Sequence, residues 1–139
     1  MTGEEKHAVL RDLAGGAITR LKQLSAPVVR VSGPLTSGGY GYDENLSRFL
    51  IAQEKLREAG YTVFDYFDGN YDERQIIPLK LPWEEVMEHY HVPIMETGLL
   101  SVMFMMPLWE SSNGANVEHD FALQTGMTIK YLPEDWFES

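Results

Sequence analysis

The chain has 139 residues, of which 44% are apolar, so it can bury one core but is too short for two ordinary domains; we expect a single domain over residues 1–139. Its 21 acidic and 11 basic residues give a net charge of −10, which would repel a nucleic acid polymer. There is no cysteine for disulfides or thiolate metal sites, and no apolar run or leader pattern that predicts a membrane segment or export, so we expect a cytoplasmic protein with no membrane partner.

The first predicted element is a helix over Glu4–Leu24, whose apolar residues recur at alternating spacings of four and three. Gly15 and Gly16 lie inside it, and each costs about 1 kcal/mol relative to alanine. Such a marginal helix needs a partner surface. That surface is either the chain's own core or a second copy of the chain, because a 3.5-residue repeat is also the repeat of a coiled coil. We treat residues 1–25 as an N-terminal helical extension.

A short strand is predicted at Val28–Val31, which is rich in β-branched residues, and it ends at Ser32, Gly33 and Pro34. The loop that follows, SGPLTSGGYGYD, is rich in glycine. It lacks the lysine and hydroxyl residue of a P-loop and does not match the dinucleotide-binding motif. Judged by itself, this loop is equally well a plain flexible turn.

Asp43 can cap the next predicted helix, Glu44–Ala59, which Gly60 ends. A second strand is predicted at Tyr61–Phe67 because of its aromatic and β-branched residues. Residues 68–82 are polar and contain prolines, and we expect a long excursion there.

A third helical stretch is predicted from Pro82 to about Tyr90, and we expect Pro93 to interrupt it because proline has no N–H and clashes with the preceding turn. A buried strand follows at Leu99–Met106, then a helix at Ala115–Gln124 and a last strand at Thr128–Leu132. Strands that alternate with helices predict an α/β fold, a three-layer sandwich around an open parallel sheet. We expect four to five strands in the flavodoxin-like or Rossmann-like order 2-1-3-4, plus the N-terminal helix.

Two loops arrive at the edge of such a sheet where ligands bind, beyond the carboxyl ends of its strands. They are the glycine-rich loop and PLWESSNGA. In the second loop, Ser112 and Gly114 precede a helix predicted to begin at Ala115, whose N–H groups and positive dipole end attract a small anion. Glu118 is expected in the first turn of that helix. The dipole alone would stabilise a carboxylate there by about 0.3–1 kcal/mol, so Glu118 is either a functional residue or a helix-end charge.

These residues carry a resemblance to a known family. SGPLT, the aromatic loop after it and the motif W-x-x-S-x-G-A-x-x-E are similar to the nucleoside 2-deoxyribosyltransferase-like superfamily, especially its small phage and bacterial members and the deoxynucleoside monophosphate N-glycosidases. The similarity spans about Val28–Leu132. It implies cleavage of the N-glycosidic bond of a (deoxy)nucleoside or its 5′-monophosphate, by hydrolysis or transfer, in a homo-oligomer and without a cofactor. The motif residues are Trp109, Ser112, Gly114, Ala115 and Glu118.

By position, the resemblance implies that Glu118 attacks the anomeric carbon and that Ser112 with the adjacent backbone holds the 5′-phosphate. The loop after the first strand would hold base and sugar, which assigns Ser32, Gly33 and Pro34 to substrate binding. Tyr40 and Asp43 are further catalytic candidates, although Asp43 also suits a plain helix cap. Tyr40 and Trp109 have the aromatic rings to stack on a base, and packing explains them equally well.

The chain departs from the family where the family has aspartates, because it reads EEVMEHYHVPIMETGLLSV there. No residue is matched to the proton donor for the leaving base. The possible substitutes are Glu85, Glu88, Glu96, Asp65 and Asp43. His89 and His91 lie two residues apart and would point to different sides of a helix, so we expect no metal site.

Two other functions stay open on the sequence alone. Loss of the acid partner would leave a non-catalytic module that binds or senses a nucleotide. A protein-interaction domain that uses the N-terminal helix would show neither binding nor turnover.

Overall fold

The computed structural model describes residues 1–65, 67 and 73–138. Contacts group them into two units. The first unit joins Met1–Leu24 with Asp65–Leu99, and the second joins Ser25–Phe64 with Leu100–Ser139. The predicted extension over residues 1–25 therefore shares a unit with a later segment of the chain, and one domain over residues 1–139 stays a prediction.

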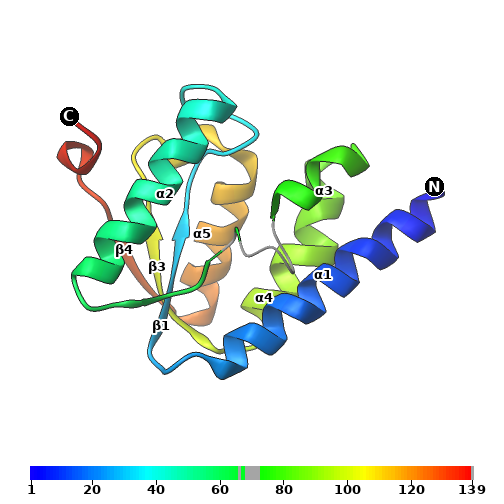
Figure 1. Cartoon of the computed structure of the whole chain (residues 1–139), viewed down its shortest axis with the longest axis horizontal. Helices are drawn as coiled ribbons and strands as arrows, with labels where there is room; N and C mark the ends of the chain where they lie inside the picture. Colours follow the sequence, from blue (N-terminus) through cyan, green and yellow to red (C-terminus); the bar gives the residue numbers. More distant parts are fainter. Residues whose placement is uncertain (66, 68–72, 139) are drawn as a thin grey trace. The chain divides into compact units, whose positions relative to one another are not determined.

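The second unit is built on a four-stranded parallel sheet in the order β2-β1-β3-β4. The helix α2 (Tyr42–Glu58) connects β1 to β2, and α5 (Asn113–Thr125) connects β3 to β4. These connections lead away from the central strands in opposite directions, so right-handed crossovers put the two helices on opposite faces of the sheet (Figure 1). The predicted α/β fold with strand order 2-1-3-4 is confirmed. The strands are β1 (Val28–Ser32), β2 (Thr62–Val63), β3 (Leu100–Met105) and β4 (Thr128–Tyr131).

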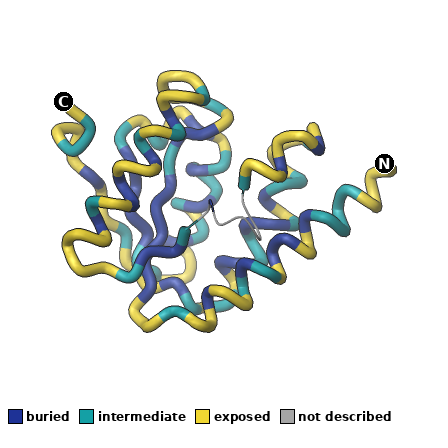
Figure 2. The backbone as a smooth tube through the Cα atoms, in the orientation of Figure 1, coloured by how far each residue is buried: buried dark blue, intermediate teal, exposed yellow. Residues whose placement is uncertain are grey.

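The centre of this sheet is strand β1, in which every residue is buried (Figure 2). Its valines pack on both faces because β1 has a strand on each side and a helix above and below. Met103 and Met105 of β3 are fully buried beside it. The strand nevertheless contains two polar residues, Arg30 and Ser32, at 0% and 1% exposure.

Several element boundaries differ from the prediction. The helix α2 begins at Tyr42 after Gly41, whose φ of 89° turns the chain into the helix, so Asp43 lies within the first turn and is not the cap. The helix α5 begins at Asn113, two residues before the predicted start. Strand β2 is limited to Thr62–Val63, shorter than the predicted Tyr61–Phe67, in which residue 66 lies outside the described residues.

The first unit contains α1 (Gly3–Gln23), which packs its apolar stripe on the helical segment from Trp83 to Met95. Thr2 and Glu5 begin α1 with a capping box. Of the two partner surfaces predicted for this helix, the structure therefore contains the one in its own chain. Its buried residues are Leu10, Leu13, Ala14, Ala17 and Leu21.

The helical segment consists of α3 (Trp83–Val86), the π-helical turn η3 (Met87–His91) and α4 (Val92–Met95). The prediction that Pro93 interrupts this helix is wrong. Proline sits in the first turn of α4, directly after the wider π-turn, which changes the hydrogen-bond pattern where the proline N–H is missing.

Of the excursion predicted over residues 68–82, residues 68–72 lie outside the described part. The remainder contains the short helices η1 (Glu73–Gln75) and η2 (Ile77–Leu79). Across the residues that are described, no helix is both long and apolar enough to cross a membrane.

Candidate functional site

The loop after β1 and the loop after β3 touch at the carboxyl edge of the sheet. The N–H of Gly39 donates to Ser111 Oγ at 2.9 Å, and Ser111 Oγ donates to the carbonyl oxygen of Leu108 at 2.6 Å. Gly38 has a φ of +71°, and a Cβ at this position would overlap Ser111. Glycine is therefore required here both for the backbone conformation and for the close approach of the two loops.

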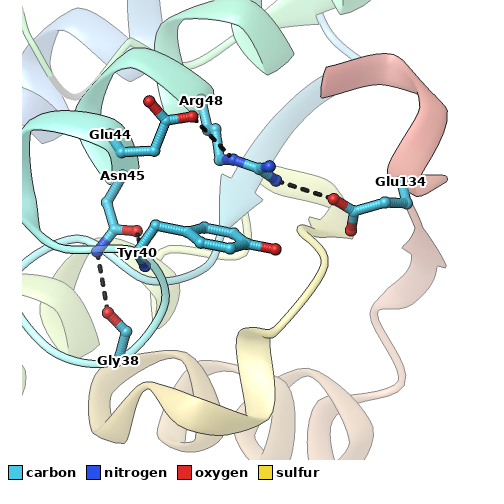
Figure 3. A network of polar contacts seen from close by, with 6 residues as sticks. All are labelled: Gly38, Tyr40, Glu44, Asn45, Arg48 and Glu134. Carbon is cyan, nitrogen blue, oxygen red and sulfur yellow. Dashed lines mark hydrogen bonds and ion pairs between the residues drawn. The ribbon is translucent and has the colours of Figure 1, made fainter. Parts of the chain in front are cut away.

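The loop after β1 is held in shape by Asn45, a side chain of α2 that is 2% exposed (Figure 3). Its Oδ1 accepts from the N–H of Tyr40 at 3.0 Å, and its Nδ2 donates to the carbonyl oxygens of Leu35 and Gly38 at 3.0 and 3.1 Å. The role of Asn45 was not predicted from the sequence. A signal existed, because Asn45 occupies the buried face of the predicted helix, one turn before Phe49.

Tyr40 lies against Arg48, which connects three segments of the second unit (Figure 3). The Arg48 guanidinium carbon stands 4.2 Å from the centre of the Tyr40 ring. Its nitrogens pair with Glu44 at 3.3 Å and with Glu134 of the C-terminal helix η5 (Glu134–Phe137) at 3.2 Å. Tyr40 keeps 51% exposure, so one face of its ring is backed by a cation while about half of the residue is open.

At the other loop, Ser112 is the N-cap of α5 and is 5% exposed. Its Oγ accepts from the N–H of Ala115 at 3.3 Å, and its carbonyl oxygen accepts from that of Asn116 at 3.1 Å. The N–H groups of Asn113 and Gly114 have no acceptor among the described residues, as expected for the first turn of a helix. The N–H groups of Asn113 and Gly114 are thus the ones that an acceptor could reach, whereas the hydroxyl of Ser112 and the N–H of Ala115 satisfy each other.

Glu118 is buried at 5% exposure and pairs with a buried arginine of the central strand. Arg30 Nη2 lies 3.3 Å from Glu118 Oε1. Because α5 begins at Asn113, Glu118 stands in the second turn, and the prediction that it lies in the first turn is wrong. The helix-end dipole acts mainly on the first turn, so it does not account for this carboxylate. Arg30 was not predicted as a site residue, although a charged residue within a valine-rich strand is a visible signal in the sequence.

Ser32 follows Arg30 by two residues, so both side chains leave β1 on the face covered by α5. Two strand residues advance the chain by about 6.6 Å, roughly the length of four helical residues. Since α5 runs back against the strand, Ser32 lies at the level of Gly114. Its buried Oγ has no hydrogen-bond partner among the described residues.

Gly33 and Pro34, which were predicted to bind substrate together with Ser32, are placed by packing. Pro34 is buried, and a Cβ on Gly33 would come within 2.7 Å of the Met106 Cβ. Gly33 thus permits close packing where the loop leaves the sheet.

Trp109 stacks on His119 of α5, with the ring centres 4.2 Å apart and the planes at 17°. His119 Nε2 and Tyr131 Oη lie at hydrogen-bond distance, 2.7 Å. One face of Trp109 is therefore covered by the imidazole, which limits the surface it offers to a ligand.

Each carboxylate named as a possible proton donor either has a partner nearby in the chain or structure or is exposed. Asp43 is exposed and borders a groove on the outer face of α2. Glu85 pairs with His7 at 2.8 Å, Glu88 lies 3.7 Å from His89, and Asp65 accepts from the N–H of Phe67 at 2.9 Å; Glu96 is exposed. No group of three or more possible ligands that could hold a metal ion is found in the part of the chain that the structure describes.

Residues 27–131 match the model of a protein family described as a domain of unknown function, DUF4406. The chain belongs to the DUF4406 family. This family is nucleoside 2-deoxyribosyltransferase-like, in agreement with the resemblance drawn from the motif. The DUF4406 match includes the whole sheet, both contacting loops and Glu118. No curated protein and no solved structure matches the chain.

Proposed function

We propose that this chain cleaves the N-glycosidic bond of a (deoxy)nucleoside 5′-monophosphate or the corresponding nucleoside, with Glu118 as the nucleophile. A 5′-phosphate would accept hydrogen bonds from the N–H groups of Asn113 and Gly114 at the positive end of α5. Glu118 stands about 6 Å farther along the helix axis than Gly114, at about 1.5 Å per residue. This separation is comparable with that between the phosphate and the anomeric carbon of one nucleotide, and it is the observation that carries the proposal.

The loops at the sheet edge supply further groups for this proposal. Ser32 has a buried hydroxyl near the level of the helix start, without a hydrogen-bond partner among the described residues. Tyr40 has an open ring surface for a sugar or base, and its loop is fastened to the loop before α5 through Gly39 and Ser111. A planar base held beside Tyr40 would leave the sugar between the loop after β1 and the first turns of α5.

The chemistry divides into two displacements at the anomeric carbon. In the first, a carboxylate oxygen of Glu118 bonds to this carbon while the bond to the base nitrogen breaks and its electron pair leaves with the base, which takes a proton from solvent. In the second, water or another base attacks the same carbon and releases the carboxylate. Water gives hydrolysis, and a second base gives transfer.

The direct test incubates the protein with deoxynucleosides and their 5′-monophosphates and measures free base by chromatography. We expect base release from the wild type and a loss of at least about 100-fold in Glu118→Gln, which keeps the size of the side chain. Glu110→Gln, which neutralises an exposed carboxylate just before α5, is the matched control and should keep wild-type activity. Full activity in Glu118→Gln would reject this mechanism.

A second function is a non-catalytic module that binds a nucleotide. The observation that favours it concerns the carboxylates that could replace the missing proton donor. Two of them already have a histidine beside them, because Glu85 is paired with His7 and Glu88 lies near His89. Calorimetry separates the two functions, because a binding module gives a heat of nucleotide binding and releases no base. If the measurements show neither a heat of binding nor base release, the remaining possibility is a protein-interaction domain.

A further inference from the structure

The candidate nucleophile shares the interior of the sheet with an arginine. Arg30 lies in the middle of β1, between β2 and β3, and its side chain is 0% exposed. Its Nη2 reaches Glu118 Oε1 at 3.3 Å. A buried carboxylate is strongly unfavourable unless a charge of opposite sign compensates it, and Arg30 supplies this charge.

The two carboxylate oxygens of Glu118 have different surroundings. Oε1 is enclosed by the protein and faces Arg30 at ion-pair distance, 3.3 Å, without forming a hydrogen bond to it. Oε2 is not enclosed, and no described residue donates a hydrogen bond to it. The side chain is 7% exposed in total, so its accessible part is small and includes Oε2. One oxygen is thus turned toward the sheet while the other is left for an incoming group.

We infer that Arg30 is a positioning residue for Glu118, which holds Oε1 against the sheet and directs Oε2 at the anomeric carbon. This inference rests on the proposed function and deepens it. Arg30 does not touch the substrate, because it is fully buried, and it acts through the orientation and charge of Glu118.

The pairing bears on both displacements. In the first, Oε2 bonds to the anomeric carbon while the carbon–nitrogen bond breaks and its electron pair leaves with the base. In the second, water adds to the same carbon and gives up a proton to solvent, the bond from carbon to Oε2 breaks, and its electron pair returns to the carboxylate. Arg30 stays beside Oε1 throughout and stabilises the carboxylate that leaves in the second step. Its contribution therefore falls on kcat and leaves substrate binding at the helix start unchanged.

The test compares Arg30→Met and Arg30→Lys with the wild type, using base release to obtain kcat and KM and urea unfolding to obtain the folded fraction. Misplacement of a reacting group by about 1 Å costs about 100-fold in rate. We expect Arg30→Met to lower kcat of the folded protein by about 10- to 100-fold with KM within about twofold, and Arg30→Lys to recover part of the rate. Arg57→Met, on the exposed side of α2, is the matched control and should keep the wild-type kcat.

A double-mutant cycle with Glu118→Gln gives a readout that needs no activity. We expect the urea midpoint of Arg30→Met with Glu118→Gln to fall by less than the sum of the two single effects, because the residues interact. An active wild type with unchanged kcat in folded Arg30→Met, or additive shifts of the midpoint, would overturn the positioning role and leave the proposed function standing. A wild type that releases no base from any substrate would instead overturn the proposed function, and the catalytic positioning with it.

Discussion

Replacement of Asn45 by alanine removes the side chain that shapes the loop after β1. Three hydrogen bonds are lost, and each contributes about 0.5–1.5 kcal/mol net. The sum is about 1.5–4.5 kcal/mol, and we expect the middle of this range, about 3 kcal/mol, because the bond to Leu35 is buried while those to Tyr40 and Gly38 are only partly buried. A chain of this size has a stability of about 5–15 kcal/mol, so the variant should still fold.

Urea unfolding measures this effect. With a urea dependence of about 2 kcal/mol per molar, the midpoint should fall by about 1.5 M. Asn45→Asp is the informative comparison, because a carboxylate still accepts from the N–H of Tyr40 but faces the carbonyl oxygens of Leu35 and Gly38 without a proton to donate. It should be at least as unstable as the alanine variant, while Ser47→Ala on the exposed side of α2 should behave as wild type. A shift below about 0.3 M in Asn45→Ala would refute the assignment of the loop's shape to this side chain.

The other predictions concern a glycine, a helix cap and the buried pair. Gly38→Ala should lower both the urea midpoint and nucleotide affinity more than Gly41→Ala does, because both positions have positive φ but only Gly38 lies against another loop; equal effects would contradict the close approach. Hydrogen bonds from the backbone and side chain of Thr2, the N-cap of α1, lower the pKa of Glu5 in the folded state. Glu5 therefore stabilises the fold above the ordinary carboxyl pKa, and this contribution disappears as pH falls through the lowered pKa. Thermal unfolding of wild type and Glu5→Ala across pH should show a difference that is present at neutral pH and vanishes in acid. Arg30→Met combined with Glu118→Leu should be as stable as the wild type in urea or more so, yet release no base, whereas either change alone should be destabilising by about 3–5 kcal/mol.

The architecture of the second unit could be predicted from the sequence because its signals are local. The valine run at Val28–Val31 and the apolar run at Leu99–Met106 each mark a buried strand, and the small residues before Ala115 mark a helix start. The element bounds were less accurate, since a helix begins where its cap is satisfied. Ser112 caps α5 through a contact that composition alone does not reveal, and this moved Glu118 from the first turn to the second.

Contacts between distant residues could not be predicted in the same way. Arg30 is visible as a charge in an apolar strand, but nothing local gives the register of β1 against α5, so its pairing with Glu118 had to come from coordinates. The junction of Gly38 and Gly39 with Ser111 likewise joins residues from two loops. The π-turn before Pro93 lies where the helical segment packs against α1, whereas proline alone predicted an interruption there.

The buried pair itself favours a functional explanation over a structural one. Two apolar side chains of similar volume in place of Arg30 and Glu118 would give a sheet at least as stable. The free-energy cost of removing the two charges from water offsets most of the attraction between them. Stability alone therefore does not explain why the central strand contains Arg30 at 0% exposure opposite a carboxylate. The proposed role of Glu118 as a nucleophile accounts for it. In that role a carboxylate stands in a site shielded from water, and a charge of opposite sign behind it on the sheet offsets the free-energy cost of burying it.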